Sequence, residues 1–116
     1  MKKLIIVCIA LVAFTTSCKT LTSVTTIKGN DSFILGNNEH SAYAVSLKNI
    51  SSKEITVYMA PIKGGTHTYQ VVKPNQKVNV NVDKNTALVV ENMSKEAVSV
   101  ALEVVGNSHL SMGYKN

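Results

Sequence analysis

The feature that most constrains this chain is a period-two alternation of apolar and polar residues. Its clearest instance is Val78-Asn79-Val80-Asn81-Val82, where three valines share one face of an extended strand and two asparagines share the other. The same alternation occurs in the stretches that begin at Tyr43, Ile55 and Val98. After Cys18, apolar residues nowhere recur at helical spacing over three turns. We therefore expect an all-β protein.

Composition and turn signals narrow the fold class. Valine, isoleucine and threonine supply 27 of the 99 residues from Cys18 to Asn116, and β-branched residues favour strands. Leu88 to Val90 is a continuous apolar run, which indicates a strand covered on both faces. Turn-forming residues break the chain at short intervals, at Asn30-Asp31, Gly36-Asn37-Asn38, Lys63-Gly64-Gly65, Pro74-Asn75, Asp83-Lys84-Asn85 and Gly106-Asn107-Ser108. These features predict an antiparallel β-sandwich, Ig-like, of about seven to eight short strands, or else a small barrel.

Two segments of the chain resemble each other. Leu47 to Val57 and Val90 to Val100 both read as strand, polar turn and strand, with an Asn-x-Ser sequence and a Lys-Glu pair in the turn. This pattern predicts two similar hairpins, one in each sheet of a sandwich. Hairpins of this composition generally resemble one another, which explains the similarity of the two segments equally well. The similarity therefore indicates no function.

The first eighteen residues differ in composition from the rest. Lys2-Lys3 precedes an unbroken apolar run from Leu4 to Phe14, which at 11 residues is too short to span a bilayer. Such a run is typical of an export signal. Thr15-Thr16-Ser17 then leads into Cys18, and this pattern resembles the type II signal peptide of bacterial lipoproteins, although leucine is commoner in that family where Thr15 stands. An ordinary export signal with a nearby cysteine is the alternative.

The resemblance implies a defined processing of Cys18. The Cys18 thiol would carry a diacylglycerol thioether, the chain would be cut between Ser17 and Cys18, and the new amino terminus could be acylated in turn. Several acyl chains would anchor the protein firmly without spanning the membrane. Lys19 beside the cysteine, in place of aspartate, favours the outer membrane, and the lack of an acidic cluster after Cys18 favours its periplasmic face.

These expectations divide the chain into three parts. Residues 1–17 are expected to be the signal peptide, residues 18–28 the lipidated cysteine with a tether and an edge strand over Leu21 to Lys28, and residues 29–116 the β-sandwich. Cleavage removes Cys8, and lipid consumes Cys18, so no thiol is left for a disulfide, a metal or a nucleophile.

The charge of the processed chain argues against nucleic acid as a partner. Ten lysines and seven acidic residues give a net charge of +3, with no arginine and no basic run that could follow a phosphate backbone. The expected partners are the membrane, through the lipid on Cys18, and another envelope protein.

The residues that usually carry catalysis or bind metals form no recognisable set. His40, His67 and His109 each follow a turn signal, but 27 and 42 residues separate them, so they show no short-spaced ligand pair. No Gly-x-Ser-x-Gly elbow is present. We therefore expect no catalytic residue, no metal site and no cofactor, and a small hydrolase or metal enzyme would require two of these histidines to converge.

One group of residues forms a candidate binding surface. Tyr58 alternates with Val57 and Met59, so its ring is expected on the outer face of its strand. Gly64, Gly65 and His67 are expected in the loop at a hairpin tip, with Tyr69 at the start of the stretch that follows. The preferred function is a non-enzymatic interaction or structural module of the periplasm. The alternative is a small ligand-binding or carbohydrate-binding module that uses Tyr58, Gly64, Gly65, His67 and Tyr69.

Overall fold

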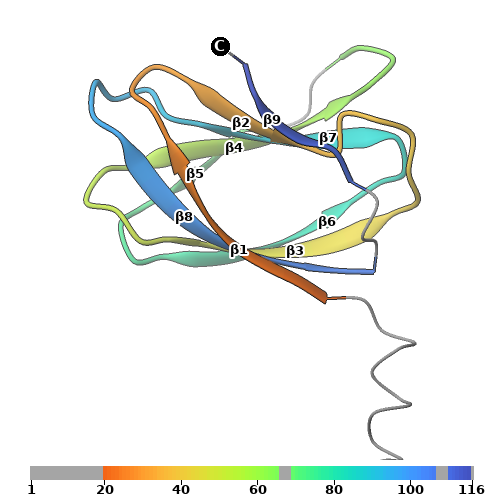
Figure 1. The fold of residues 1–116 in the computed structure, drawn as a ribbon, viewed down its shortest axis with the longest axis horizontal. Helices are drawn as coiled ribbons and strands as arrows, with labels where there is room; N and C mark the ends of the chain where they lie inside the picture. The colour runs from red at the N-terminus through yellow and green to blue at the C-terminus, as the bar shows by residue number, and fades with distance from the viewer. Residues whose placement is uncertain (1–19, 66–68, 107–109, 116) are drawn as a thin grey trace, which may run out of the picture.

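The fold is a sandwich of two antiparallel sheets (Figure 1). The computed structural model describes residues 20–65, 69–106 and 110–115, which form nine strands and no helix. The strands are β1 (Thr20–Ile27), β2 (Ser32–Leu35), β3 (Tyr43–Asn49), β4 (Ile55–Pro61), β5 (Gln70–Val72), β6 (Lys77–Val82), β7 (Thr86–Glu91), β8 (Val98–Val105) and β9 (Met112–Tyr114). The four-stranded sheet has the order β1-β8-β3-β6, and the five-stranded sheet has the order β5-β4-β7-β2-β9. The prediction of an all-β antiparallel sandwich is confirmed.

The predicted Ig-like arrangement is not confirmed. The first two strands of an immunoglobulin domain are neighbours in one sheet, whereas β1 and β2 lie in different sheets here. Of the consecutive described strands, only β4 and β5 pair with each other. Strands β1 to β8 therefore have the double Greek-key order of a jelly roll, and β9 is added beside β2. Alternation could not reveal this order, because it reports which face of a strand is buried and not which strand lies beside it.

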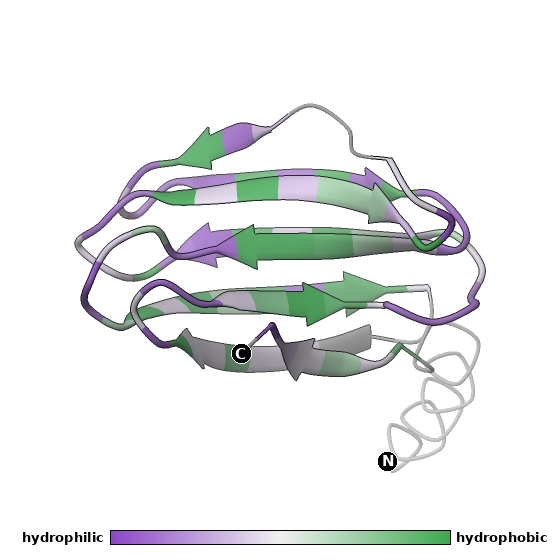
Figure 2. Ribbon diagram, turned by 90° about the horizontal axis from the view of Figure 1, so that it is seen from above, coloured by the Kyte–Doolittle hydropathy of each residue, from purple (hydrophilic) through white to green (hydrophobic). Residues whose placement is uncertain are grey.

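Alternate residues of the long strands fill the space between the sheets. Figure 2 shows hydrophobic and more polar segments alternating along these strands. The predicted inward faces are confirmed on β3, β4, β6 and β8, where the core includes Tyr43, Val45, Leu47, Ile55, Val57, Val78, Val82, Val98, Val100, Leu102 and Val104. On β7, all residues from Thr86 to Val90 are buried, as the continuous apolar run predicted. The reason is that β7 lies between β4 and β2, where Val89 faces outward between Tyr58 and Ile34.

The two similar segments are corners between sheets, so the prediction that they are hairpins was wrong. The first segment joins β3 to β4, and the second joins β7 to β8; in both cases the chain passes from one sheet to the other. The side chains of Asn49 and Asn92 are fully buried at these corners. Because each asparagine bonds to main-chain groups from separate parts of the chain, it holds a crossing between sheets instead of a two-strand hairpin.

The two asparagines make nearly the same hydrogen bonds. The Nδ2 of Asn49 donates to the carbonyl oxygens of Lys53 (2.6 Å) and Val72 (3.0 Å). The Nδ2 of Asn92 donates to the carbonyls of Glu96 (2.7 Å), Ile27 (3.0 Å) and Lys28 (3.0 Å). Their Oδ1 atoms accept from the main-chain N–H and the hydroxyl of the serine two residues on. The sequence similarity of the two segments therefore reflects the same hydrogen bonds at the two corners.

The same correspondence extends to two tight turns that pack against these corners. In the turn after β1, the N–H of Asp31 donates to the Lys28 carbonyl, and Asn30 has a φ of 60°. In the turn after β5, the N–H of Gln76 donates to the Lys73 carbonyl, and Asn75 has a φ of 66°. Asparagine tolerates this left-handed backbone better than most residues. The two sheets correspond in the same way. Replacing β1, β8, β3 and β6 by β5, β4, β7 and β2 converts the order of the four-stranded sheet into that of the five-stranded sheet without β9.

The edge strand expected over Leu21 to Lys28 corresponds to β1. This strand pairs with β8 along its whole length, from Thr20 opposite Val105 to Ile27 opposite Val98, and therefore belongs to the sandwich. Ser17, Cys18 and the rest of residues 1–19 lie outside the described residues. Within the described part, no helix is long and apolar enough to cross a membrane.

Candidate functional site

The hairpin of β4 and β5 brings two tyrosine rings together. β4 pairs with β5 from Ile55 opposite Val72 to Val57 opposite Gln70. Continuing this register by one residue places Tyr69 opposite Tyr58. The two ring centroids lie 4.5 Å apart with an interplanar angle of 39°. The Tyr69 side chain is 54% exposed, so the pair presents aromatic surface to solvent on the outer face of the five-stranded sheet.

A groove of about 310 Å³ lies beside this pair. Residues from three neighbouring strands line it: Tyr58, Ala60 and Pro61 from β4, Ala87 and Val89 from β7, and Ser32 and Ile34 from β2. Asn37, Ile62, Gly64 and Lys115 complete the lining. Small side chains explain the hollow, because Ala60 and Ala87 are directly opposite each other in the sheet. We call this depression and the Tyr58–Tyr69 pair the outer-face groove.

Polar and charged groups line the outer-face groove and the hollow beside it. Burial raises the pKa of the Tyr58 phenol above its usual value of 10, and the charge of Glu91 and the neighbouring Tyr69 raise it further. The Tyr58 hydroxyl is therefore protonated at neutral pH and can donate a hydrogen bond. Glu91 and Lys115 both line an adjoining hollow with Ser32, so a negative and a positive side chain are both present there. This arrangement suits a ligand with apolar faces and hydrogen-bonding edges.

The residues predicted for a binding surface are only partly assembled. Tyr58 and Tyr69 are in contact, and Gly64 lines the groove. Gly65 follows in the same connection, where both glycines have positive φ, 109° and 92°, and no heavy atom lies near the position a Cβ would take. The expected hairpin is present, since this connection joins the paired strands β4 and β5. His67 lies outside the described residues.

Sequence reasoning missed most of the groove lining. Ile34, Ala87 and Lys115 lie on or beside strands far from Tyr58 in the chain, and the register of β2 and β7 brings them together. One signal was present in the sequence: the continuous apolar run on β7 implied that its outward residue, Val89, is covered by neighbours. It did not identify those neighbours.

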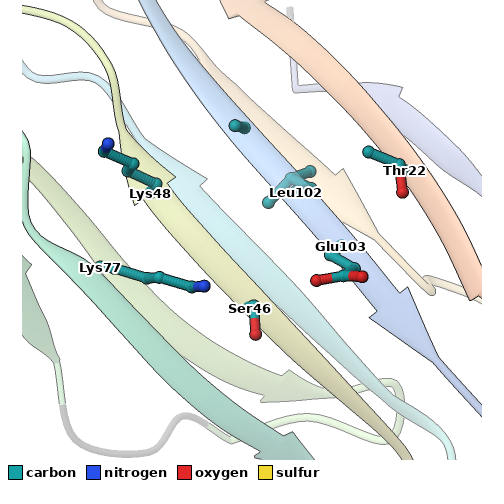
Figure 3. Close-up of a pocket in the computed structure, with 7 residues that line it drawn as sticks. Thr22, Ser46, Lys48, Lys77, Leu102 and Glu103 are labelled. Atoms are coloured by element: carbon teal, nitrogen blue, oxygen red, sulfur yellow. The ribbon is translucent and has the colours of Figure 1, made fainter.

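A second hollow, of about 290 Å³, lies on the outer face of the four-stranded sheet. Thr22, Ser46, Lys48, Lys77, Ala101, Leu102 and Glu103 line it, and Figure 3 shows the Lys77 side chain extended toward Ser46. Lys48 and Lys77 are directly opposite each other on β3 and β6. Their like charges repel each other, which is unfavourable in a sheet. Ser46 donates its hydroxyl hydrogen to Asn79 at 2.7 Å. No aromatic ring lines this hollow, so the outer-face groove is the better candidate for a ligand that stacks.

His40, the histidine in the described part of the chain, contacts main-chain groups of two segments. The Nδ1 and Nε2 atoms of His40 lie 2.6 Å and 2.8 Å from the carbonyl oxygens of Ser41 and Thr86. The His40 ring packs edge-on against Tyr43, at 5.0 Å between centroids. Both ring nitrogens are therefore engaged with main chain. Between the described residues, no three His, Cys, Asp or Glu side chains come close enough to hold a metal ion, and His67 and His109 lie outside that part.

The sequence comparisons identify no relative. No protein-family model matches the chain, and no curated protein matches it. Several solved structures have a similar fold. In the three described next, sequence identity to this chain is 17% or less, so they inform the fold alone.

Three solved structures illustrate this fold. The capsular polysaccharide assembling protein CapF from Staphylococcus aureus superposes with a TM-score of 0.55 at 14% identity, over 74% of this chain and 24% of CapF. A protein of the Bacillus endospore appendages, described as disulfide-linked pili, gives 0.54 at 13% identity, over 76% of this chain and 84% of its own. Procruciferin, an 11S globulin from Brassica napus, gives 0.53 at 17% identity, over 81% and 22%. This chain thus spans about a quarter of CapF and of procruciferin.

Proposed function

We propose that this protein is a lipid-anchored, non-enzymatic interaction module of the bacterial envelope, and that the outer-face groove is its contact surface. The observation that supports this proposal is the contact between Tyr58 and Tyr69 beside a largely apolar groove on the outer face of the five-stranded sheet. Hydrophobic side chains fill the space between the sheets. A partner must therefore be recognised on the outside of the fold.

The anchor is inferred from the lipobox-like sequence that ends at Cys18. β1 begins at Thr20, so only Lys19 separates the anchored cysteine from the sandwich. So short a tether would keep the sandwich against the headgroups. The proposed location is the periplasmic face of the outer membrane, which is supported by Lys19 and by the lack of acidic residues directly after Cys18.

Membrane fractionation tests the anchor. We expect Cys18→Ala to leave the protein unlipidated, so that it moves from the membrane fraction to the soluble fraction or keeps its uncleaved signal. Cys8→Ala is the matched control, because Cys8 lies in the segment that is removed, and this variant should fractionate as the original protein does. Unchanged, lipid-labelled membrane retention of the Cys18→Ala variant would contradict the anchor.

Affinity capture from solubilised envelopes tests the contact surface. We expect one or more envelope proteins to be recovered reproducibly with the original chain and lost with Tyr58→Ala or Tyr69→Ala. Tyr114→Ala is the control, since its ring contacts Phe33 on a different strand pair and is similarly exposed. Capture that is absent, or equal for all variants, would argue against this surface.

A second candidate function is carbohydrate binding. It is favoured by the exposed Tyr58–Tyr69 pair, because aromatic rings present the apolar surface on which a sugar can stack. We expect a glycan array to give a signal that Tyr69→Ala abolishes and Tyr69→Phe keeps. Silence of the array at high protein concentration would discard this candidate and leave the protein-interaction proposal standing.

A further inference from the structure

The four outer edges of the two sheets differ in length and charge. β5 and β9 have three residues each. β6 begins with Lys77, three residues after Pro74, and lysine and proline near an edge discourage further pairing. β1 has eight residues, Thr20 to Ile27, without a charged residue or proline. Among the described strands, β1 is therefore the long edge that lacks the usual protection.

The exposed side of β1 also carries an unusual apolar residue. Val24 is 66% exposed at the centre of the strand, between the exposed Thr22 and Thr26. β1 pairs with β8 along one side, and no other described strand lies beside its second side. A long uncharged edge of this kind is a template for another strand.

We propose that β1 pairs with β1 of a second copy of this chain, antiparallel and with Val24 opposite Val24. The occupant is inferred from the symmetry of the strand about its central residue. In this register, Thr22 lies opposite Thr26 of the second copy, Ser23 opposite Thr25, and Leu21 opposite Ile27. From Leu21 to Ile27 each residue thus faces one of similar chemistry, and every pair occurs twice, as in any two-fold symmetric contact.

The contact has no electrostatic obstacle. The first charged residue after β1 is Lys28, which lies opposite Thr20 of the second copy and not opposite a cation. β-branched and hydroxyl pairs across antiparallel strands are favourable neighbours. Pairing would join two four-stranded sheets into one of eight, in the order β6-β3-β8-β1-β1-β8-β3-β6, and would leave the outer-face groove on the other sheet free.

The dimer is compatible with the proposed anchor in one orientation. The two Thr20 residues lie at opposite ends of the ribbon, roughly 27 Å apart for eight residues of strand. If Cys18 is lipidated, both anchors reach one membrane when it runs parallel to the joined sheet. This orientation depends on the proposed function, whereas the pairing of β1 does not.

Cysteine cross-linking tests the register. In an antiparallel ladder, directly opposite Cα atoms lie about 4.5 or 5.5 Å apart, and both distances suit a disulfide. We expect Val24→Cys in the full-length protein to form a species of twice the monomer mass under mild oxidation. Val71→Cys, on the short edge strand β5 and 50% exposed, is the matched control and should remain monomeric. Failure of the Val24→Cys protein to cross-link above this control would overturn the register.

A charge exchange tests the partner. Because the Val24 side chain is exposed, Val24→Lys should leave the circular dichroism spectrum unchanged while raising the dimer dissociation constant at least tenfold in detergent-extracted protein. Val24→Glu should do the same, and mixing the two variants should restore a dimer that contains one of each. Met93→Lys, at an exposed site on a corner, should have no effect. A dimer unaffected by Val24→Lys, or cross-linking of Val24→Cys only to a different protein, would overturn the assignment of a second copy.

Discussion

Single buried polar residues hold the sandwich corners in place. Asn92 satisfies three main-chain carbonyls with two amide hydrogens while accepting two hydrogen bonds from Ser94. No described buried side-chain polar atom lacks a hydrogen-bond partner. Because buried main-chain groups lose water on folding, each asparagine replaces the solvent that the corner excludes. Its removal would leave several groups without a partner at once.

Asn92→Ala is expected to lower the free energy of unfolding by about 2–4 kcal/mol, since each orphaned buried group costs roughly 1–3 kcal/mol. Asn49→Ala should have a similar effect at the equivalent corner. Asn81→Ala, at an exposed position on β6, is the control and should change stability by less than about 0.5 kcal/mol. Urea denaturation measures all three. Equal midpoints for the corner variants and the control would show that the corners do not depend on these asparagines.

Tyr43 gives the fold a sensitivity to alkaline pH. Its phenol is buried, and its hydroxyl donates to the Leu35 carbonyl at 3.3 Å. Burial raises the pKa of Tyr43 well above the usual 10. Above pH 10 the unfolded chain releases this proton while the folded chain retains it, so the unfolded state binds fewer protons and stability falls as pH rises. Below pH 10 the group is protonated in both states and contributes no slope.

The expected loss is about 1.4 kcal/mol for each pH unit above 10, the value for one proton. Urea midpoints measured from pH 8 to pH 11 test it. Tyr43→Phe removes the titrating group, so the stability of this variant should fall less steeply above pH 10 than that of the original protein. The lost hydrogen bond should lower its stability by about 1 kcal/mol at neutral pH. If the two proteins lose stability in parallel above pH 10, Tyr43 is not responsible, and Tyr58, whose pKa is also raised, is the next candidate.

At the scale of strands, the sequence revealed local structure and left the pairing open. Alternation on β3, β6 and β8 identified the buried faces, because a residue's contact with water depends on its own side chain. The apolar run on β7 identified a strand covered on both faces. β9 was not predicted, since its three residues are too short to show a period. Strand order depends on contacts between distant residues, which a single sequence does not display.

The candidate site likewise could be predicted from the sequence only where its residues come from one hairpin. Tyr58 and Tyr69 could be associated from the sequence because a short connection makes β4 and β5 a hairpin, and a hairpin fixes its own register. Ile34 and Ala87 could not be associated with them, because β2 and β7 join β4 only through the jelly-roll order. The corners were misread as hairpins for the related reason that an Asn-x-Ser turn looks alike in both settings.

The turn after β1 packs closely against the corner between β7 and β8. A Cβ built on Gly29 would overlap the carbonyl group of Lys95, in the corner between β7 and β8. Gly29→Ala should therefore destabilise the protein by about 1–3 kcal/mol, the usual cost of forced overpacking. Gly113→Ala on β9 is the control, because no atom lies within 4 Å of the place its Cβ would occupy and its φ is ordinary, so we expect no loss of stability. Equal melting temperatures would indicate that the corner shifts freely.

The whole molecule is built from two interleaved halves. Every strand pairing in the described residues joins one of β1 to β4 with one of β5 to β9. Neither half contains two hydrogen-bonded neighbours, although the corners and tight turns of the two halves correspond closely. A strand without a neighbour cannot satisfy its main-chain groups within a sheet. The halves therefore depend on each other for all of their sheet structure.

This interdependence predicts the behaviour of the chain when it is divided in the connection between β4 and β5. A fragment ending at Gly65 and a fragment beginning at Thr66 should each lack the β-sheet signal in circular dichroism. Mixing them should restore that signal, because all seven strand pairings are intermolecular in the mixture. A first fragment that carries Leu47→Asp, a charge at a fully buried core position, is the control and should not restore it. Cooperative unfolding of either fragment alone would mean that a half can form its own sheet, and the interleaved order would then not be required for folding.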